Sequence, residues 1–271
     1  MAFSLYPKGK GLWVGQFSRL AEGAVTHGIS TRFGGVSQPP YDSLNLALHV
    51  GDVPAAVLEN RRRFCAALGL SAERICSPEQ VHGDKVCRVR LEDAGRGALS
   101  YTDAVPGTDA LITDVPGVPL FLCYADCTPI LLFDPVRRVA AIAHGGWKGT
   151  LKNIVARTVR AMENDFGTKA ADCLAAIGPA IGRECYEVGE EVARAFEEAY
   201  PALSSEVLRR EAGHCHLDLA LMNRRQLEDV GLLPAQIDSA SACTSCNVNV
   251  FFSYRASGGT TGRISAVIAI R

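Results

Sequence analysis

The chain has 271 residues, and its 28 lysines and arginines nearly balance its 29 aspartates and glutamates. This length suits one large domain or two small ones and is enough for a substantial hydrophobic core. The balanced charge argues against a broad surface for nucleic acid or anionic membrane, although it leaves room for a local basic pocket. Because no apolar run reaches membrane-spanning length and residues 1–10 do not read as a signal peptide, we expect a cytoplasmic protein.

The first half of the chain predicts mainly strands. Residues 25–30 form a strand pattern that a glycine turn at 32–35 follows. A helix is predicted over 54–68, since proline stands at an early position, apolar residues recur at helical spacing, and a glycine follows. Alternating or continuous apolar runs predict the next strands, at residues 85–91, 109–113, 118–124 and 128–133.

The second half alternates more regularly between strands and helices. A strand is predicted at 138–143, and helical spacing predicts a helix at 150–166, with Gly167 as its C-cap. The remaining predictions are strands at 173–177, 251–254 and 263–270 and helices at 188–200 and 217–230. We see no repeats, low-complexity tract or Pro/Ser-rich linker. The pattern predicts one α/β domain over residues 1–271, a layered sandwich with mixed β-sheets flanked by helices.

Three residues point to metal chemistry. Cys127 and His144 each follow an apolar, strand-like run, and His82 stands in a similar setting upstream. Two imidazoles and one thiolate are good zinc ligands, and three protein ligands leave a fourth position open for water or substrate. Zinc there would lower the pKa of water and polarise an electrophile. The neighbouring carboxyl of Asp126 would support a ligand or act as a general base.

Spacing alone leaves two other interpretations of these residues open. The histidines can be ordinary loop residues with satisfied hydrogen bonds, and Cys127 can be packed in the core, since dispersed ligands carry no spacing signature. Alternatively, Cys127 with His82 or His144 can form a nucleophile and its base. Metal content distinguishes the nucleophile–base pair from the metal site, because a metal-bound thiolate is a poor nucleophile.

Candidate anion-binding residues lie nearby in the sequence. The glycine-rich turn after His144 would offer backbone N–H groups at a helix start, with Lys148 assisting, although it fits neither a dinucleotide fingerprint nor a Walker A loop. Most of the basic run at 61–63 should be solvated, but one member, such as Arg61, can point inward as a phosphate ligand. Asn45 is a further polar candidate. A tight turn that simply requires glycine is the competing interpretation.

Ten cysteines are many for such a chain, and we expect them to be reduced because no export signal is evident. Most should be buried as small apolar side chains. Cys243 and Cys246 form a CxxC, a spacing found in redox pairs and in zinc sites. Because no second CxxC and no thioredoxin-like context accompany it, we favour a structural or incidental role. His214 and His216 form an HxH that we place in a surface loop. The full set of cysteines is Cys65, Cys76, Cys87, Cys123, Cys127, Cys173, Cys185, Cys215, Cys243 and Cys246.

Eight short motifs together carry a family resemblance. They are HGISTRFGGVS at 27–37, SLNL at 43–46, QVHG at 80–83, ADCTP at 125–129, HGGWKG at 144–149, IGP at 177–179, CYEV at 185–188 and FFSYR at 251–255. From about residue 25 to its end, the chain resembles the multicopper polyphenol oxidase, or laccase-domain, family. Members of that family are also described as purine nucleoside phosphorylases.

The resemblance implies an α/β layered fold and one zinc ion held by His82, Cys127 and His144. It also implies phosphorolysis of adenosine, inosine, guanosine and methylthioadenosine, together with deamination of adenosine. Copper-dependent laccase activity has also been claimed for the family. The substrates would then be purine nucleosides and phosphate, with no nucleic acid or membrane partner.

The residues discriminate between these activities. A multicopper oxidase needs several HxH pairs, whereas this chain has six histidines and one HxH, so zinc fits better than copper. Deamination would use Asp126 to move protons, and phosphorolysis would use Arg61 to hold phosphate. We therefore predict a zinc-dependent purine nucleoside phosphorylase with adenosine deaminase activity. The alternatives are a copper polyphenol oxidase, a cysteine hydrolase that uses Cys127, and a purine- or partner-binding protein without enzymatic activity.

Overall fold

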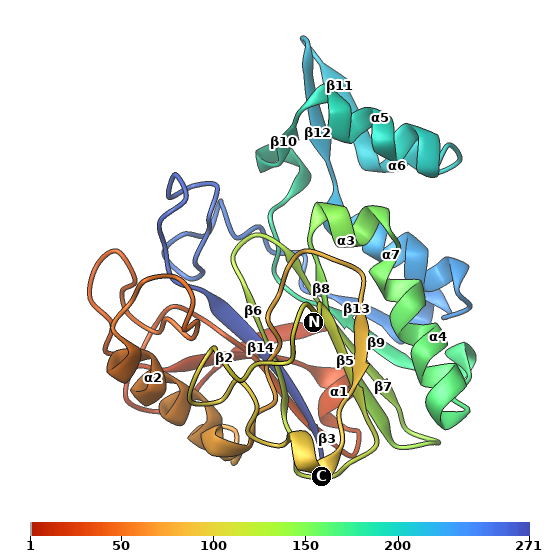
Figure 1. Ribbon diagram of the computed structural model, residues 1–271. Helices are drawn as coiled ribbons and strands as arrows, with labels where there is room; N and C mark the ends of the chain where they lie inside the picture. Colours follow the sequence, from red (N-terminus) through yellow and green to blue (C-terminus); the bar gives the residue numbers. More distant parts are fainter. Residues whose placement is uncertain (1) are drawn as a thin grey trace.

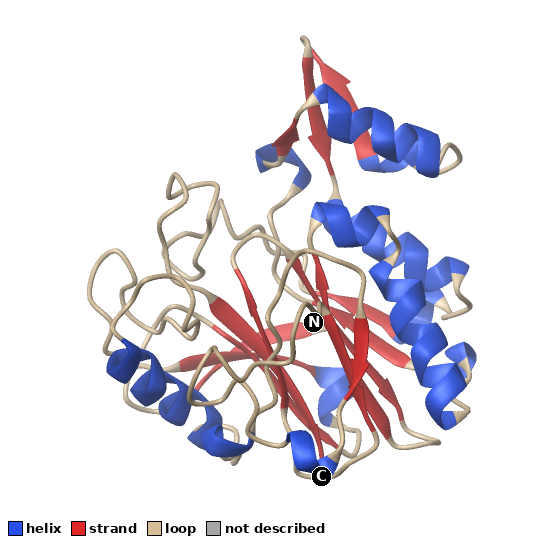
Figure 2. Ribbon diagram, viewed as in Figure 1, coloured by secondary structure: helices blue, strands red, loops and turns tan. Residues whose placement is uncertain are grey.

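Two large β-sheets pack face to face in the computed structural model, which describes residues 2–271, and a smaller sheet lies beyond one end of the pair (Figure 1). Helices cover the outer faces of the two large sheets (Figure 2). Residues 2–271 hold three sheets and seven α-helices in all. The predicted α/β layered fold, with mixed sheet and flanking helices, is confirmed. Within the same residues, no helix is both long and apolar enough to cross a bilayer.

The first sheet is antiparallel and has five strands in the order β1-β2-β3-β14-β6. Its strands are β1 (Phe3–Pro7), β2 (Trp13–Phe17), β3 (Val25–Ser30), β6 (Leu120–Tyr124) and β14 (Ile264–Ile270). The C-terminal strand β14 pairs with both β3 and β6, so it places the end of the chain in the middle of a sheet that begins with the N-terminal strands. The sequence predicted β3, β6 and β14 but missed the edge strand β1 and its neighbour β2, which mix polar, glycine and exposed aromatic residues.

The second sheet is mixed and has six strands in the order β13-β9-β7-β8-β5-β4. Its strands are β4 (Val86–Arg88), β5 (Ala110–Thr113), β7 (Thr128–Asp134), β8 (Val139–Gly145), β9 (Leu174–Ile177) and β13 (Ile237–Ser239). The central pairs are antiparallel, whereas the pairs at both edges are parallel. Every residue of β7 and β8 is buried, as expected for strands covered on both faces.

Alternation along β7 explains how the layers are held together. Leu131 and Phe133 belong to the core between the two large sheets, whereas Ile130 and Leu132 pack on the opposite face, beneath α4 (Ile154–Phe166) and α7 (Leu219–Asp229). The outer face of the five-stranded sheet is covered in the same way by α2 (Pro54–Ala66). Two short helices, α1 (Ser18–Ala21) and α3 (Trp147–Leu151), complete the large layers.

One predicted helix is divided in the structure. The segment predicted as a helix over 150–166 is α3 followed by α4, with the break at Asn153. Asn153 adopts a left-handed conformation, with φ of 59°, and its side chain accepts a hydrogen bond from the backbone N–H of Ala156. Asparagine tolerates this conformation and caps a helix well, so it starts α4 afresh.

The structure corrects two predictions, one in the third sheet and one close to the C-terminal strand. The third sheet comprises β10 (Glu187–Val188), β11 (Leu208–Glu211) and β12 (His214–Leu217), and α5 (Glu190–Ala199) and α6 (Ser204–Val207) pack beside it. The HxH motif thus lies in a strand rather than in the predicted loop. Residues 251–254, predicted as a strand, form no regular element, because their apolar content reflects burial of Phe251 and Phe252 in the core between the sheets.

His27 of β3 is a buried titratable group within the first sheet. Its side chain is 1% exposed, and its Nε2 accepts a hydrogen bond of 2.8 Å from the backbone N–H of Phe17 in β2. Burial, together with the positive charge of Arg271, lowers the pKa of His27 from 6.5 to about 4. The neutral imidazole therefore links β3 to β2.

We expect the free energy of unfolding to fall as the pH drops from 6.5 toward 4, because the unfolded chain takes up a proton at His27 that the folded chain excludes. The loss between pH 7 and pH 5 should be roughly 2 kcal/mol. Urea unfolding of the wild type and of His27→Gln at both pH values measures it. The variant should lack this part of the pH dependence, and an identical dependence in both proteins would contradict the assignment.

Candidate metal centre

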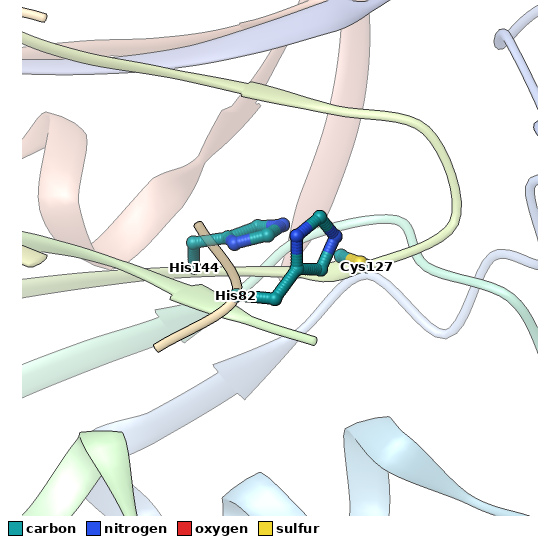
Figure 3. A group of neighbouring side chains, drawn as sticks. All are labelled: His82, Cys127 and His144. Atoms are coloured by element: carbon teal, nitrogen blue, oxygen red, sulfur yellow. The ribbon is translucent and has the colours of Figure 1, made fainter. Parts of the chain in front are cut away.

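Three side chains from separate parts of the chain meet at one point. His82 lies in the loop before β4, Cys127 lies between β6 and β7, and His144 lies in β8. Their ligand atoms all lie within 4.8 Å of one another, and the two imidazole rings are 4.7 Å apart at their centroids (Figure 3). The structure thus brings together the three residues that the sequence nominated as ligands.

A buried carboxylate, Asp109, holds the backbone at His82 and the ring of His144. Its oxygens accept hydrogen bonds from the backbone N–H groups of Val81, His82 and Gly83, at 3.1, 3.0 and 2.7 Å. The same carboxylate bonds Nδ1 of His144 at 2.8 Å. Since Nδ1 is engaged, Nε2 of His144 is the ring nitrogen left for a metal, an arrangement common among histidine ligands.

Gly146 allows the three side chains to approach so closely. A Cβ atom at this position would lie 3.0 Å from Cδ2 of His82 and 3.2 Å from Sγ of Cys127. The glycine-rich turn that followed His144 in the sequence therefore has a steric explanation at Gly146.

Cys127 and His144 influence each other's charge. Burial would raise the pKa of the Cys127 thiol, but the charge of His144 and hydrogen bonds from both histidines lower it to about 6. Burial would likewise lower the pKa of His144, whereas the Cys127 thiolate and Asp109 raise it to about 9. By themselves, the two groups form a thiolate–imidazolium pair between about pH 6 and pH 9. Deprotonated sulfur is the form that binds metal ions.

The three residues line a cavity of about 510 Å³. This volume lies within the range of small-molecule sites. Aromatic side chains and two arginines contribute to its wall, among them Trp147, Tyr186, Tyr254, Arg255 and Arg263. The site is thus a pocket that combines sulfur and nitrogen ligands, aromatic rings and positive charge.

Asp126 also lines the cavity, but both of its carboxylate oxygens already have partners. Oδ1 accepts a hydrogen bond of 2.6 Å from the hydroxyl of Thr244, and Oδ2 accepts one of 2.7 Å from the backbone N–H of Arg255. Asp126 has a φ of 84°, a left-handed conformation that aspartate tolerates better than most residues. Its contacts tie the loop before β14 to the metal-ligand segment.

The other three predicted site residues are not among those that line the cavity. The Arg61 guanidinium is buried and donates to the carbonyl oxygens of Leu46, Gly97 and Ala98. Lys148 is exposed and lies over the ring of Trp147. Asn45 is buried, and its Oδ1 accepts a hydrogen bond of 2.9 Å from the backbone N–H of Arg263, so it supports a wall residue from behind.

Arg263 is one of the cavity residues that sequence reasoning missed. One of its nitrogens, NH1, donates to the carbonyl oxygens of Thr261 and Gly262, while Nε and NH2 have no hydrogen-bond partner within residues 2–271. Its guanidinium lies 5.5 Å from the ring centroid of Tyr254. The one available signal was its position at the start of the last predicted strand, 263–270, because several other site residues also stood at the ends of predicted strands.

The HxH pair does not add to the metal centre. Nδ1 of His214 contacts Glu187, and Nδ1 of His216 contacts the carbonyl oxygen of Arg183. Neither histidine belongs to the two groups of potential metal ligands found in residues 2–271. Within those residues, the geometry supports no multinuclear copper cluster built on this motif.

Comparisons with known proteins identify the family of this chain. Residues 26–271 match the family described as multi-copper polyphenol oxidoreductase laccase. The chain is 41% identical over 250 residues to the purine nucleoside phosphorylase YlmD of Geobacillus stearothermophilus. This match covers 92% of this chain and 91% of that protein. It is also 35% identical over 252 residues to adenosine deaminase RL5 of an unknown prokaryotic organism, a match that covers 91% of this chain and 94% of that protein.

The crystal structure of YlmD from Geobacillus stearothermophilus has a TM-score of 0.93 to this fold at 38% sequence identity, with 98% of each chain covered. The resemblance drawn from the sequence motifs is therefore confirmed. The chain belongs to the multi-copper polyphenol oxidoreductase laccase family.

Proposed function

We propose that this protein is a purine nucleoside phosphorylase with adenosine deaminase activity, and that it acts at a single zinc site held by His82, Cys127 and His144. Its substrates would be adenosine, inosine, guanosine and methylthioadenosine, with phosphate as the second substrate. The observation that carries the proposal is the convergence of these ligands in a cavity of about 510 Å³. The cavity is also lined by aromatic rings and by arginine donors that have no partner among residues 2–271. The names of the relatives support the class of substrate.

Zinc fits the donor set. Two imidazoles and one thiolate supply three ligands of the kinds zinc prefers and leave one position open. Asp109 fixes the ring of His144, and the low pKa of Cys127 provides the sulfur as a thiolate at neutral pH. When bound, zinc would supply Lewis acidity toward the substrate.

The aromatic wall suits a purine base. Trp147, Tyr186 and Tyr254 present flat rings to the cavity, and such rings stack on a base through dispersion and quadrupole interactions. The Arg255 guanidinium lies 5.2 Å from the ring centroid of Tyr186 and donates to the carbonyl oxygen of Glu187, so it restrains the Tyr186 segment. We propose that the nucleoside lies between this wall and the metal ligands.

Arg263 is our candidate for the phosphate site, in place of Arg61. Its Nε and NH2 donors are free within the described chain, whereas Arg61 uses its guanidinium on backbone carbonyl oxygens. Partly buried arginine donors bind phosphate strongly because the hydrogen bonds are charge-assisted. Asn45 would act indirectly, by holding the backbone of Arg263.

We propose two roles for Asp126, one positional and one chemical. Its hydrogen bonds to Thr244 and to the backbone of Arg255 hold the cavity wall. The predicted proton transfer during deamination would use the same carboxylate. Each oxygen of Asp126 keeps a second lone pair beside its one hydrogen bond, so the carboxylate can accept a proton while it holds the wall.

Cys127→Ala should remove the zinc bound at this centre and lower inosine phosphorolysis by more than about 100-fold, because a ligand contributes more than the outer contacts that orient it. Zinc is measured by mass spectrometry, and ribose-1-phosphate is measured with and without phosphate. Cys87→Ser, at a half-buried cysteine outside the cluster, is the matched control. Unchanged zinc content in Cys127→Ala, or nucleoside cleavage that does not need phosphate, would refute the proposal.

The Cys127–His144 pair supports one alternative, a cysteine hydrolase, because its charge state is that of a nucleophile and its base. The same preparation separates the two functions. Phosphorolysis should disappear on zinc chelation and return when zinc is restored. Turnover of an amide that survives chelation but not thiol alkylation would favour the hydrolase.

Arg263→Gln should raise the KM for phosphate by roughly 10- to 100-fold, the effect of losing hydrogen bonds to a charged group. Arg61→Lys should instead lower the melting temperature and leave that KM near its wild-type value, since Arg61 contacts backbone carbonyl oxygens. Steady-state kinetics at varied phosphate concentrations measure both. The opposite pattern would return the phosphate site to Arg61.

A further inference from the structure

A cluster of three cysteine side chains lies outside the candidate metal centre. Cys185 precedes β10, while Cys243 and Cys246 lie in the loop between β13 and β14. The three Sγ atoms lie within 4.8 Å of one another, and those of Cys185 and Cys246 are 3.3 Å apart. Distant parts of the chain thus bring three thiols together.

The spacing of these atoms suits a common metal. Sulfurs that share a tetrahedral zinc ion, each at about 2.3 Å from it, lie about 3.8 Å apart. The observed cluster spans that separation, so small side-chain rotations would bring the thiols into position. Cys243 and Cys246 also have the Cys-x2-Cys spacing of structural zinc sites.

The backbone around Cys243 favours a thiolate. Its Sγ accepts hydrogen bonds from the backbone N–H groups of Gly182, at 3.1 Å, and Cys246, at 3.4 Å. Such donors stabilise negative charge on sulfur and orient it as a ligand. A Cβ atom at position 182 would lie 3.2 Å from Cβ and 3.3 Å from Sγ of Cys243, so glycine allows this close approach.

A disulfide would explain only part of this arrangement. It would join two of the sulfurs and leave the third with no role, and it would not require the N–H donors at Cys243. A metal uses all three thiols and those donors. Cys246 is exposed, whereas Cys185 and Cys243 are half-buried, so an ion could enter from solvent.

We propose that Cys185, Cys243 and Cys246 form a second metal site, which binds a soft d10 cation of the zinc class through three thiolates. The site lies apart from the His82, Cys127 and His144 centre and uses none of its ligands. Its fourth position is open to solvent or to an exogenous thiol. Each bound thiol releases its proton to solvent when the ion enters.

If the cavity binds the nucleoside as proposed above, an ion at the second site would restrain one of its walls. Thr244, between the two cysteines of the CxxC, donates to Asp126, and Cys185 directly precedes the wall residue Tyr186. An ion that joins the 243–246 loop to residue 185 therefore connects two segments that face the substrate. Its loss should raise the KM for inosine more than it lowers kcat, since it loosens binding and leaves the first metal in place.

Zinc content measured on the full chain, reduced with a phosphine and freed of loosely bound metal, tests the proposal. We expect two zinc ions in the wild type, one in Cys246→Ser, one in Cys127→Ala and none in the double variant. Cys87→Ser should retain two. Because Cys246 is exposed, its serine variant should fold normally.

X-ray absorption of the zinc that remains in Cys127→Ala gives a second readout. We expect sulfur at about 2.3 Å to dominate its ligand shell. A single wild-type zinc that Cys127→Ala removes and Cys246→Ser retains would overturn the proposal, as would a Cys185–Cys246 disulfide in the zinc-saturated protein. A single zinc that Cys246→Ser removes and Cys127→Ala retains would support the second site and contradict the proposed catalytic one.

Discussion

The carboxylate of Asp109 is the constraint on which the candidate active site depends. It is fully buried, yet it accepts hydrogen bonds from three successive backbone N–H groups at residues 81–83 and contacts the His144 imidazole. Although burial alone would raise its pKa, His144 and the backbone donors lower the pKa below its ordinary value. The Asp109 carboxylate therefore holds the loop that contains His82 against the end of β8. By engaging Nδ1 of His144, it also leaves Nε2 as the nitrogen available to a metal.

The layered fold supplies the rest of the cavity from segments that are distant in sequence. β8 and the β6–β7 connection provide His144 and Cys127. The loop before β14 provides Tyr254 and the two arginines of the wall, while Trp147 comes from α3 and Tyr186 from the segment before β10. Asp126 links these parts, since it follows β6 and bonds the loop at Thr244. The proposed three-cysteine site would strengthen the same link from the outer side, which gives the wall a support independent of the first metal.

The sequence predicted much of the fold because β7 and β8 are buried on both faces and their apolar runs are continuous. Cys127 and His144 were found because each follows such a run, and His82 because it precedes a predicted strand; the family motifs then joined the three as ligands. Arg61 was assigned to phosphate because a helical charge run does not reveal which side chain turns inward or what it meets there. The role of Arg263 and the meeting of Cys185 with the CxxC depend on long-range pairing, which one sequence does not display.

The affinity of the first site for zinc in Asp109→Asn tests the central claim most directly. Measured by competition with a chelator in a Cys246→Ser background, the Kd should rise about 10- to 100-fold, as expected when a contact that orients a ligand is lost. Asp134→Asn is the matched control, because Asp134 is also buried and accepts two backbone N–H bonds, at the turn between β7 and β8. An unchanged Kd in Asp109→Asn, or an equal rise in Asp134→Asn, would contradict the account.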